Sequence, residues 1–220
     1  MSSKKLFVFD LDGTIVDTVE DIAHAMNTVL LHYGLPVKLI EHYRQLIGNG
    51  TLNMVTKTLG SDSPYIDEAH VLFEIQYRDN CLVHTKPFNN IETLMQGVVS
   101  NGDNIAILTN KVQPLAELIV SALFPSLKFD AIVGLRPENR AKPNPDTLLA
   151  LVNKFAANEC YMIGDTVVDL QTANNAGVNS VAVLWGYSSE AELRAMNPDY
   201  IFEDIDSMSL SFGLDAAIPA

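Results

Sequence analysis

The spacing of hydrophobic residues along the chain changes near residue 86. After a short apolar run at residues 6–10, apolar positions recur every three or four residues, which is the period of a helix with one buried face. Beyond residue 86, short apolar runs alternate with helical stretches. The pattern predicts an all-helical segment inserted between a first strand and an alternating α/β segment.

The helical segment is expected to hold four helices. The first spans residues 17–33, where Asp17 or Thr18 is a candidate N-cap and Gly34 and Pro36 follow the last apolar position. No strand is expected in this segment. Three further helices are predicted over residues 39–47, 52–59 and 66–82.

The segment after Pro87 is expected to form a parallel sheet to which residues 6–10 also belong. Such alternation is typical of a sheet with helices on both faces and ligands bound beyond the carboxyl ends of its strands. The expected α/β core comprises residues 1–15 and 86–220, and residues 16–85 would form a helical cap over that edge. Strands are predicted over residues 104–109, 130–133, 160–163, 180–184 and 200–202.

Composition places the chain among ordinary globular proteins. Its 220 residues are 48% hydrophobic and 19% charged, without a low-complexity tract. The longest apolar runs are shorter than the roughly 20 residues that cross a bilayer, and the N-terminus lacks a signal peptide's apolar region. Cys81 and Cys160 are far apart and are expected to be reduced core residues. We therefore expect a cytoplasmic protein with no membrane association.

The chain is acidic, with 14 lysines and arginines against 27 aspartates and glutamates and a net charge of −13. This charge repels a nucleic-acid backbone and no basic cluster offsets it, so nucleic acid is not an expected partner. A small anionic substrate would meet the same repulsion. A metal cation and a few well-placed lysines would overcome it.

The strongest chemical signal is Phe-Asp-Leu-Asp-Gly-Thr at residues 9–14, where the first strand ends. Side chains two apart point the same way along an extended chain, so the carboxylates of Asp10 and Asp12 can face one pocket. Gly13 then permits a sharp turn. Two carboxylates held together favour a hard cation such as Mg²⁺. Taken alone, these residues would form an aspartate-rich turn that caps a helix.

A second acidic segment, Gly-Asp-Thr-Val-Val-Asp at residues 164–169, also follows an apolar strand. Asp165 and Asp169 are four residues apart, so a helix starting near Asp165 would place both on one face. There they could complete a metal site. In the plain alternative, Asp165 only caps that helix.

Two further strand ends carry groups that suit a phosphate. Thr109 and the backbone N–H of Asn110, close to an expected helix start, can form a cradle, although Thr-Asn is commonly only a cap. In Arg-Ala-Lys-Pro-Asn-Pro at residues 140–145, the prolines present Lys142, which would otherwise be a solvated loop lysine. Because all four segments fall at the same edge of the sheet, we expect them to converge.

In these four motifs the chain resembles the haloacid dehalogenase superfamily over essentially its whole length. The resemblance implies a Rossmann-like core with an inserted helical cap. It also implies that Asp10 is the nucleophile, that Asp12 is the acid and base, and that Thr109 and Lys142 bind the phosphoryl group. The Mg²⁺ ligands would be Asp10, Asp12, Asp165 and Asp169, the last acting directly or through water.

Within that superfamily the chain is similar to phosphoglycolate phosphatases. Residues 44–50 resemble the cap loop that meets the substrate in that family, and Trp-Gly-Tyr at 185–187 resembles its C-terminal strand region. Apart from this resemblance, Gly48 and Gly50 would be interpreted as part of a turn between two helices. The resemblance implies a small phosphorylated metabolite as substrate, bound by Asn110, Lys111, Arg44, Gly48, Asn49 and Gly50.

The expected reaction transfers a phosphoryl group in line to Asp10 and then hydrolyses the aspartyl phosphate, with Asp12 moving the protons. One alternative is a phosphosugar mutase that uses the same two aspartates. Others are a 5′-nucleotidase-type phosphatase and a non-enzymatic phosphate-sensing domain. Carbon–halogen hydrolysis is disfavoured because relatives with that chemistry lack the second acid.

The histidines do not show the spacing of a metal site and are interpreted as surface or packing residues. The sequence carries no signal for an oligomeric state. The five positions are His24, His32, His42, His70 and His84.

Overall fold

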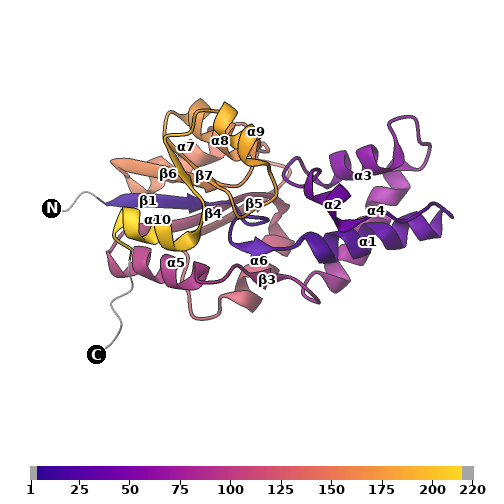
Figure 1. Cartoon of the computed structure of the whole chain (residues 1–220), viewed down its shortest axis with the longest axis horizontal. Coiled ribbons are helices and arrows are strands. Elements are labelled where there is room, and N and C mark those ends of the chain that lie inside the picture. The colour runs from indigo at the N-terminus through magenta and orange to yellow at the C-terminus, as the bar shows by residue number, and fades with distance from the viewer. Residues whose placement is uncertain (1–3, 215–220) are drawn as a thin grey trace.

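The computed structural model describes residues 4–214 and has a parallel sheet at its centre (Figure 1). The six strands lie in the order β5-β4-β1-β6-β7-β8, and every neighbouring pair is parallel. This confirms the predicted α/β fold class. The strands are β1 (Lys5–Phe9), β4 (Asn104–Val112), β5 (Ala131–Leu135), β6 (Glu159–Gly164), β7 (Asn179–Val183) and β8 (Tyr200–Phe202).

Helices cover both faces of the sheet, because alternate residues of each buried strand point to opposite sides. In β1, Phe7 and Phe9 face one hydrophobic cluster, whereas Leu6 and Val8 face another. The first cluster is covered by α5 (Ile91–Ser100), α6 (Gln113–Leu123) and α10 (Ile205–Phe212). The opposite side carries α7 (Asp146–Phe155), α8 (Val167–Ala176) and α9 (Glu190–Ala195).

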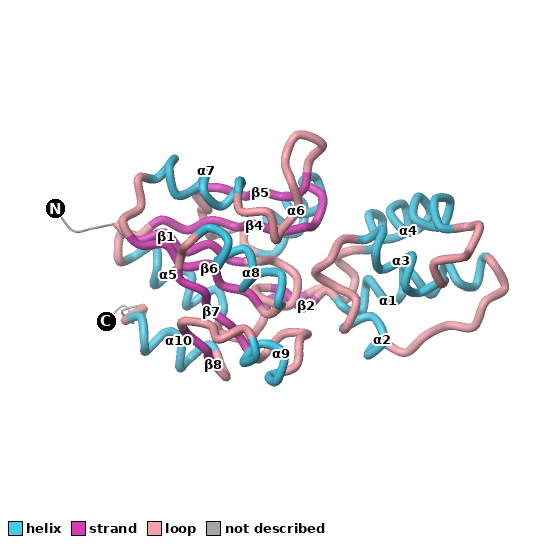
Figure 2. The backbone as a smooth tube through the Cα atoms, turned by 90° about the horizontal axis from the view of Figure 1, so that it is seen from above, coloured by secondary structure: helices cyan, strands magenta, loops and turns pink. Residues whose placement is uncertain are grey.

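Four helices between β1 and β4 form a separate bundle, here called the helix group (Figure 2). It lies at the end of the sheet where β1 finishes, and α1 packs against α2 and α4 while α3 packs against α4. All four helices lie where the hydrophobic spacing placed them. They are α1 (Val19–His32), α2 (Ile40–Arg44), α3 (Thr51–Leu59) and α4 (Ile66–Asn80).

Two short strands connect the helix group to the sheet. β2 (Val16–Asp17) leads into α1, and β3 (Lys86–Pro87) leads back to the sheet, and the two pair antiparallel. Two-residue strands are too short to show a hydrophobic period, which is why the sequence does not predict them.

Other features agree with the expectations or refine them. Cys81 and Cys160 are buried and unpaired. None of the helices within residues 4–214 is long and apolar enough to cross a membrane. The strand expected at residues 104–109 continues to Val112, with a shift of register after Leu108. This irregular end of β4 lies beside the candidate site.

Candidate active site

The order of the strands brings the predicted motifs together at one edge. β1 lies between β4 and β6, so the carboxyl ends of these three strands are adjacent. Asp10 follows β1, Thr109 lies near the end of β4, and Asp165 follows β6. The chain runs from β1 to β4 and β5 on one side of β1 and then crosses from β5 to β6 on the other side, and such a reversal of strand order opens a ligand-binding crevice in α/β folds.

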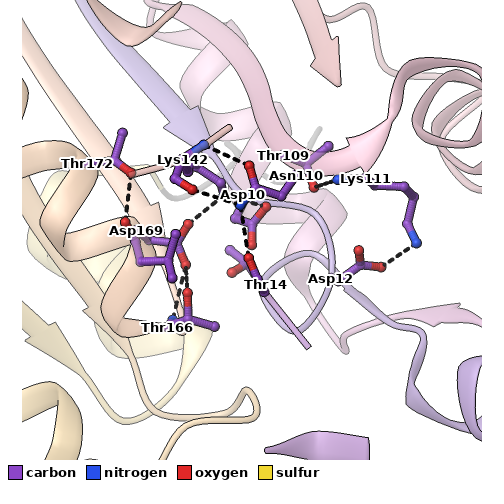
Figure 3. A network of polar contacts seen from close by, with 12 residues as sticks. Asp10, Asp12, Thr14, Thr109, Asn110, Lys111, Lys142, Thr166, Asp169 and Thr172 are labelled. Atoms are coloured by element: carbon purple, nitrogen blue, oxygen red, sulfur yellow. Dashed lines mark hydrogen bonds and ion pairs between the residues drawn. The ribbon is translucent and has the colours of Figure 1, made fainter. Parts of the chain in front are cut away.

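Three carboxylates converge there in a buried cluster. Asp10, Asp165 and Asp169 each offer an oxygen, and these atoms lie within 4.8 Å of one another. Lys142 lies between two of them, with Nζ 2.8 Å from Asp10 Oδ1 and 2.5 Å from Asp169 Oδ1 (Figure 3). All four side chains are buried. We call these four residues the acidic centre.

The acidic centre changes the proton affinity of its members. Burial, opposed by Lys142 and assisted by Asp169, raises the pKa of Asp10 to about 7. Burial and the charges of Asp169 and Asp10 raise the pKa of Asp165 well above its usual range. Burial alone would lower the pKa of Lys142, but the adjacent carboxylates outweigh it and raise that pKa. One lysine therefore does not neutralise the cluster, and a divalent cation would.

The carboxylates of Asp165 and Asp169 are held by different groups. Asp165 accepts hydrogen bonds from Thr14 Oγ1 and from the backbone N–H of Tyr187, both at 2.8 Å. Asp169 Oδ2 accepts from the hydroxyl of Thr166 at 2.6 Å and from its backbone N–H at 3.1 Å. These bonds use both carboxylate oxygens of Asp165, whereas Asp169 keeps Oδ1 for Lys142.

The predicted stacking of Asp165 and Asp169 on one helix face is wrong. The N-cap of α8 is Thr166, and Asp165 precedes it, so only Asp169 lies in the helix. Thr166 and Asp169 form a capping box, the reciprocal arrangement in which each side chain bonds the other's backbone N–H. The two aspartates meet because the chain turns sharply between strand and helix.

Two glycines make room for the carboxylate of Asp165. Gly13 has φ +82°, a conformation that favours glycine, and a Cβ there would overlap Asp165 Oδ2. A Cβ at Gly186 would overlap the Asp165 side chain as well. The turn after Asp12 and the turn after β7 therefore both close onto this acid.

Lys142 is positioned by Asn110 rather than by prolines alone. Asn110 Oδ1 accepts from the backbone N–H of Lys142 at 2.8 Å, and Asn110 Nδ2 donates to the Lys142 carbonyl at 3.1 Å. The same amide donates to the carbonyl of Gly48 in the helix group at 2.9 Å. The side chain of Asn110 thus joins the lysine segment to the predicted cap loop.

The helix start expected close to Asn110 is misplaced. β4 continues through this residue, and α6 begins at Gln113, with Pro114 in its first turn. The register shift between Leu108 and Val112 lets the strand run on, so Asn110 lies within β4 and not beside a helix terminus. A phosphate cradle at Thr109 and Asn110 would therefore not use the N-terminus of α6.

Asp12 lies apart from the acidic centre (Figure 3). Its Oδ1 is 3.1 Å from Lys111 Nζ and accepts a hydrogen bond of 2.7 Å from Thr18 Oγ1. Lys111 in turn donates to the hydroxyl of Tyr77 on α4 at 2.8 Å. The group of clustered metal-ligand atoms found among the described residues at this edge does not include Asp12.

A pocket lies between the sheet edge and the helix group. Among the predicted substrate-binding residues, Gly48, Gly50, Asn110 and Lys111 line it, whereas Arg44 and Asn49 line a neighbouring depression with Tyr187. The remaining predicted residues along this pocket are Asp10, Asp12 and Thr109.

The sequence reasoning did not identify Thr14, Thr166 and Tyr187 as supports of the acids, or Tyr77 as a partner of Lys111. Thr166 followed by Asp169 carries the capping-box spacing, which could have been recognised. Tyr77 had no such signal, because its position on the buried face of α4 looks like any core residue.

A sequence model of the family described as haloacid dehalogenase-like hydrolase matches residues 7–183. The phosphoglycolate phosphatase of Aquifex aeolicus is 30% identical over 198 residues, which cover 89% of this chain and 91% of that protein. The phosphoglycolate phosphatase of Pseudomonas syringae pv. syringae is 31% identical over 210 residues, covering 91% and 77%.

Solved structures share the whole fold. A haloacid dehalogenase-like family hydrolase from Streptococcus pneumoniae superposes with a TM-score of 0.86 at 26% identity, covering 96% of this chain and 100% of that chain. A protein from Lactobacillus delbrueckii subsp. bulgaricus superposes with a TM-score of 0.88 at 27% identity, covering 95% and 98%. The similarity therefore includes both the sheet and the helix group.

Proposed function

Since the chain belongs to the haloacid dehalogenase-like hydrolase family, we propose that it hydrolyses small phosphate monoesters of the phosphoglycolate type. The observation that carries the proposal is the acidic centre, where Lys142 contacts Asp10 and Asp169 at the sheet edge. A carboxylate beside a fixed cation, open to a pocket, suits transfer of a phosphoryl group.

Asp10 is the proposed nucleophile. Its carboxylate attacks phosphorus, the bond from phosphorus to the leaving oxygen breaks, and an aspartyl phosphate forms on Asp10. Lys142, held by Asn110, offsets the negative charge of the phosphoryl oxygens. Thr109 lies next to this position and is proposed as a further phosphoryl contact.

Asp12 is the proposed acid and base. It lines the same pocket as Asp10, so it can protonate the leaving oxygen in the first step. It can then remove a proton from the water that hydrolyses the aspartyl phosphate. The bond from Thr18 and the ion pair with Lys111 fix the orientation of its carboxylate.

The acidic centre suits Mg²⁺, because its ligands are hard carboxylate oxygens and its charge is only partly offset by Lys142. Asp10, Asp165 and Asp169 would hold the ion, which supplies charge neutralisation to the phosphoryl group. The assignment of the Asp12 carboxylate as a metal ligand stays a prediction, since this group pairs with Lys111.

We further propose that residues 16–85 act as the cap. Gly48 and Gly50 border the pocket, and the bond from Asn110 to the Gly48 carbonyl ties their loop to the core. Lys111 supplies a cation inside the pocket, which would suit a leaving alcohol that carries a carboxylate. Arg44 and Asn49 lie beside the pocket and would need the loop to move to reach a substrate.

The test is a screen of phosphate monoesters with phosphate release as the readout. The panel contains 2-phosphoglycolate, sugar phosphates and nucleoside monophosphates, and the expected result is steady release of phosphate with preference for the smallest anionic esters. Isomerised sugar phosphate without free phosphate would identify a mutase instead. A single turnover that stops after one phosphate per chain would identify a phosphate sensor.

Removal of divalent cations is expected to abolish turnover. EDTA-treated protein should recover its activity on addition of Mg²⁺, and Mg²⁺ should raise the midpoint of thermal unfolding because it relieves repulsion in the acidic centre. Asp165→Asn should remove most of that stabilisation, while Asp62→Asn in an exposed loop should keep it. Unchanged turnover in EDTA would contradict the metal assignment.

Replacement of Asp12 by asparagine is expected to lower the rate by roughly 10²-fold or more, because no other group would donate the proton. Binding of substrate should change much less, since the amide keeps the size of the side chain. The measurement is kcat and KM for two esters that differ in leaving-group acidity. The loss should be smaller for the ester with the more acidic leaving group, and an equal loss for both would remove Asp12 from the role of acid.

A further inference from the structure

We propose that Glu20, His24 and His84 form a second metal site, specific for a late first-row transition cation such as Zn²⁺. No motif links these residues in the sequence, but the structure brings their exposed side chains together beside the helix group. One ligand atom of each lies within 4.8 Å of the others. The rings of His24 and His84 have their centroids 5.1 Å apart, and His84 Nδ1 is 3.5 Å from Glu20 Oε1.

The three ligands come from two segments that are fixed against each other. Glu20 and His24 are four residues apart on α1, so their side chains lie one turn apart on the same face. His84 lies between α4 and β3. Its backbone N–H and that of Thr85 both donate to the buried carboxylate of Asp21, each at 2.9 Å. Asp21 therefore holds the third ligand beside the other two.

The chemistry of these ligands distinguishes this site from the acidic centre. Two imidazoles and one carboxylate suit zinc, copper or nickel, whereas Mg²⁺ prefers oxygen ligands alone. The side chains are exposed, so they can adjust their rotamers to a metal at little cost and leave a coordination position for water. A surface hollow borders His24 and His84. The net charge of −13 favours any cation.

The site lies at the junction between the helix group and the sheet, so a bound metal would link two chain segments there. The chain enters the helix group at the start of α1 and leaves it through the segment that ends in His84, next to the paired strands β2 and β3. A metal that binds residues from both segments links them, so it should stabilise the junction between the helix group and the sheet.

The test is calorimetric titration of the full chain with ZnCl₂ in excess Mg²⁺, which keeps the acidic centre supplied with its own cation. The expected result is one Zn²⁺ per chain at this site, with His24→Ala and His84→Ala each weakening binding by about tenfold or more. His32→Ala, which removes an exposed histidine from the last turn of the same helix, is the matched control and should bind as the unmodified chain does.

Resonances of the imidazole nitrogens provide a second readout. On addition of Zn²⁺, those of His24 and His84 should shift while those of His32 stay in place. Zinc binding that is equally strong in His24→Ala, His84→Ala and His32→Ala would overturn the proposal, and so would shifts confined to other histidines. Both outcomes are independent of phosphatase activity, so they would leave the proposed function untouched.

Discussion

Asp10→Asn is expected to abolish turnover, by roughly 10⁴-fold or more, because the amide cannot attack phosphorus and no other carboxylate has its position. Asp10 follows the central strand and borders the pocket, whereas Asp165 and Asp169 are engaged by Thr14, Tyr187 and Thr166. The amide has the same size as the carboxylate and removes one negative charge from a crowded, buried cluster. The fold should therefore persist.

The measurements are the rate of phosphate release and the intact mass of protein quenched in acid during turnover. The unmodified chain should show a phosphorylated species that Asp10→Asn lacks. Asp62→Asn, an exposed change of the same type, should match the unmodified chain in both. A variant that keeps full activity, or still becomes phosphorylated at the same level, would refute the assignment of Asp10 as nucleophile.

The sheet and the convergence of motifs could be predicted because both depend on short-range patterns. Apolar runs of strand length located β1, β4 and β6, and parallel topology requires their carboxyl ends to share one edge. Asp10 and Asp165 could therefore be placed near each other without knowledge of any contact. Once a strand is located in the sequence, the position of the residue at its carboxyl end is located as well.

The side-chain partners could not be predicted, because they depend on contacts between distant segments. Asn110 was expected to offer a backbone N–H to phosphate, yet its side chain holds the backbone of Lys142 through an irregular end of β4. Asp12 was expected to face one pocket with Asp10 and does line it, yet its partners Lys111 and Thr18 were not predicted. Neither the register shift in β4 nor these side-chain pairings produces a periodic pattern in the sequence.

Lys142→Met is expected to lower the free energy of unfolding of the metal-free protein by about 3–5 kcal/mol, the range for removing one partner of a buried ion pair. The variant keeps the length and apolar stem of the side chain but leaves Asp10, Asp165 and Asp169 buried together without their cation. Lys128→Met, in an exposed loop, is the matched control and should have little effect. Turnover should fall as well, because the phosphoryl contact is lost.

The free energy of unfolding should fall as the pH rises, because the pKa of Asp10 is raised in the folded chain. The pKa of Asp10 is raised from 3.8 to about 7 in the folded chain, so the folded state holds a proton that the unfolded state releases between these values. The stability from this proton is complete below the unfolded pKa and is lost as the pH rises through the folded one. Without Lys142 the Asp10 carboxylate is disfavoured further and its folded-state pKa rises, so the variant should continue to lose stability above about pH 7, where the loss in the unmodified chain levels off.

A double variant separates the electrostatic cause from simple packing. If Lys142→Met destabilises the fold through uncompensated charge, then Asp10→Asn in the same chain should restore part of the loss, because one of the repelling carboxylates becomes neutral. Mg²⁺ should restore part of it too, by binding where the ammonium was missing. Urea unfolding of the single and double variants, in EDTA and in Mg²⁺, measures both effects. Additive losses that Mg²⁺ does not change would show that Lys142 contributes only by packing.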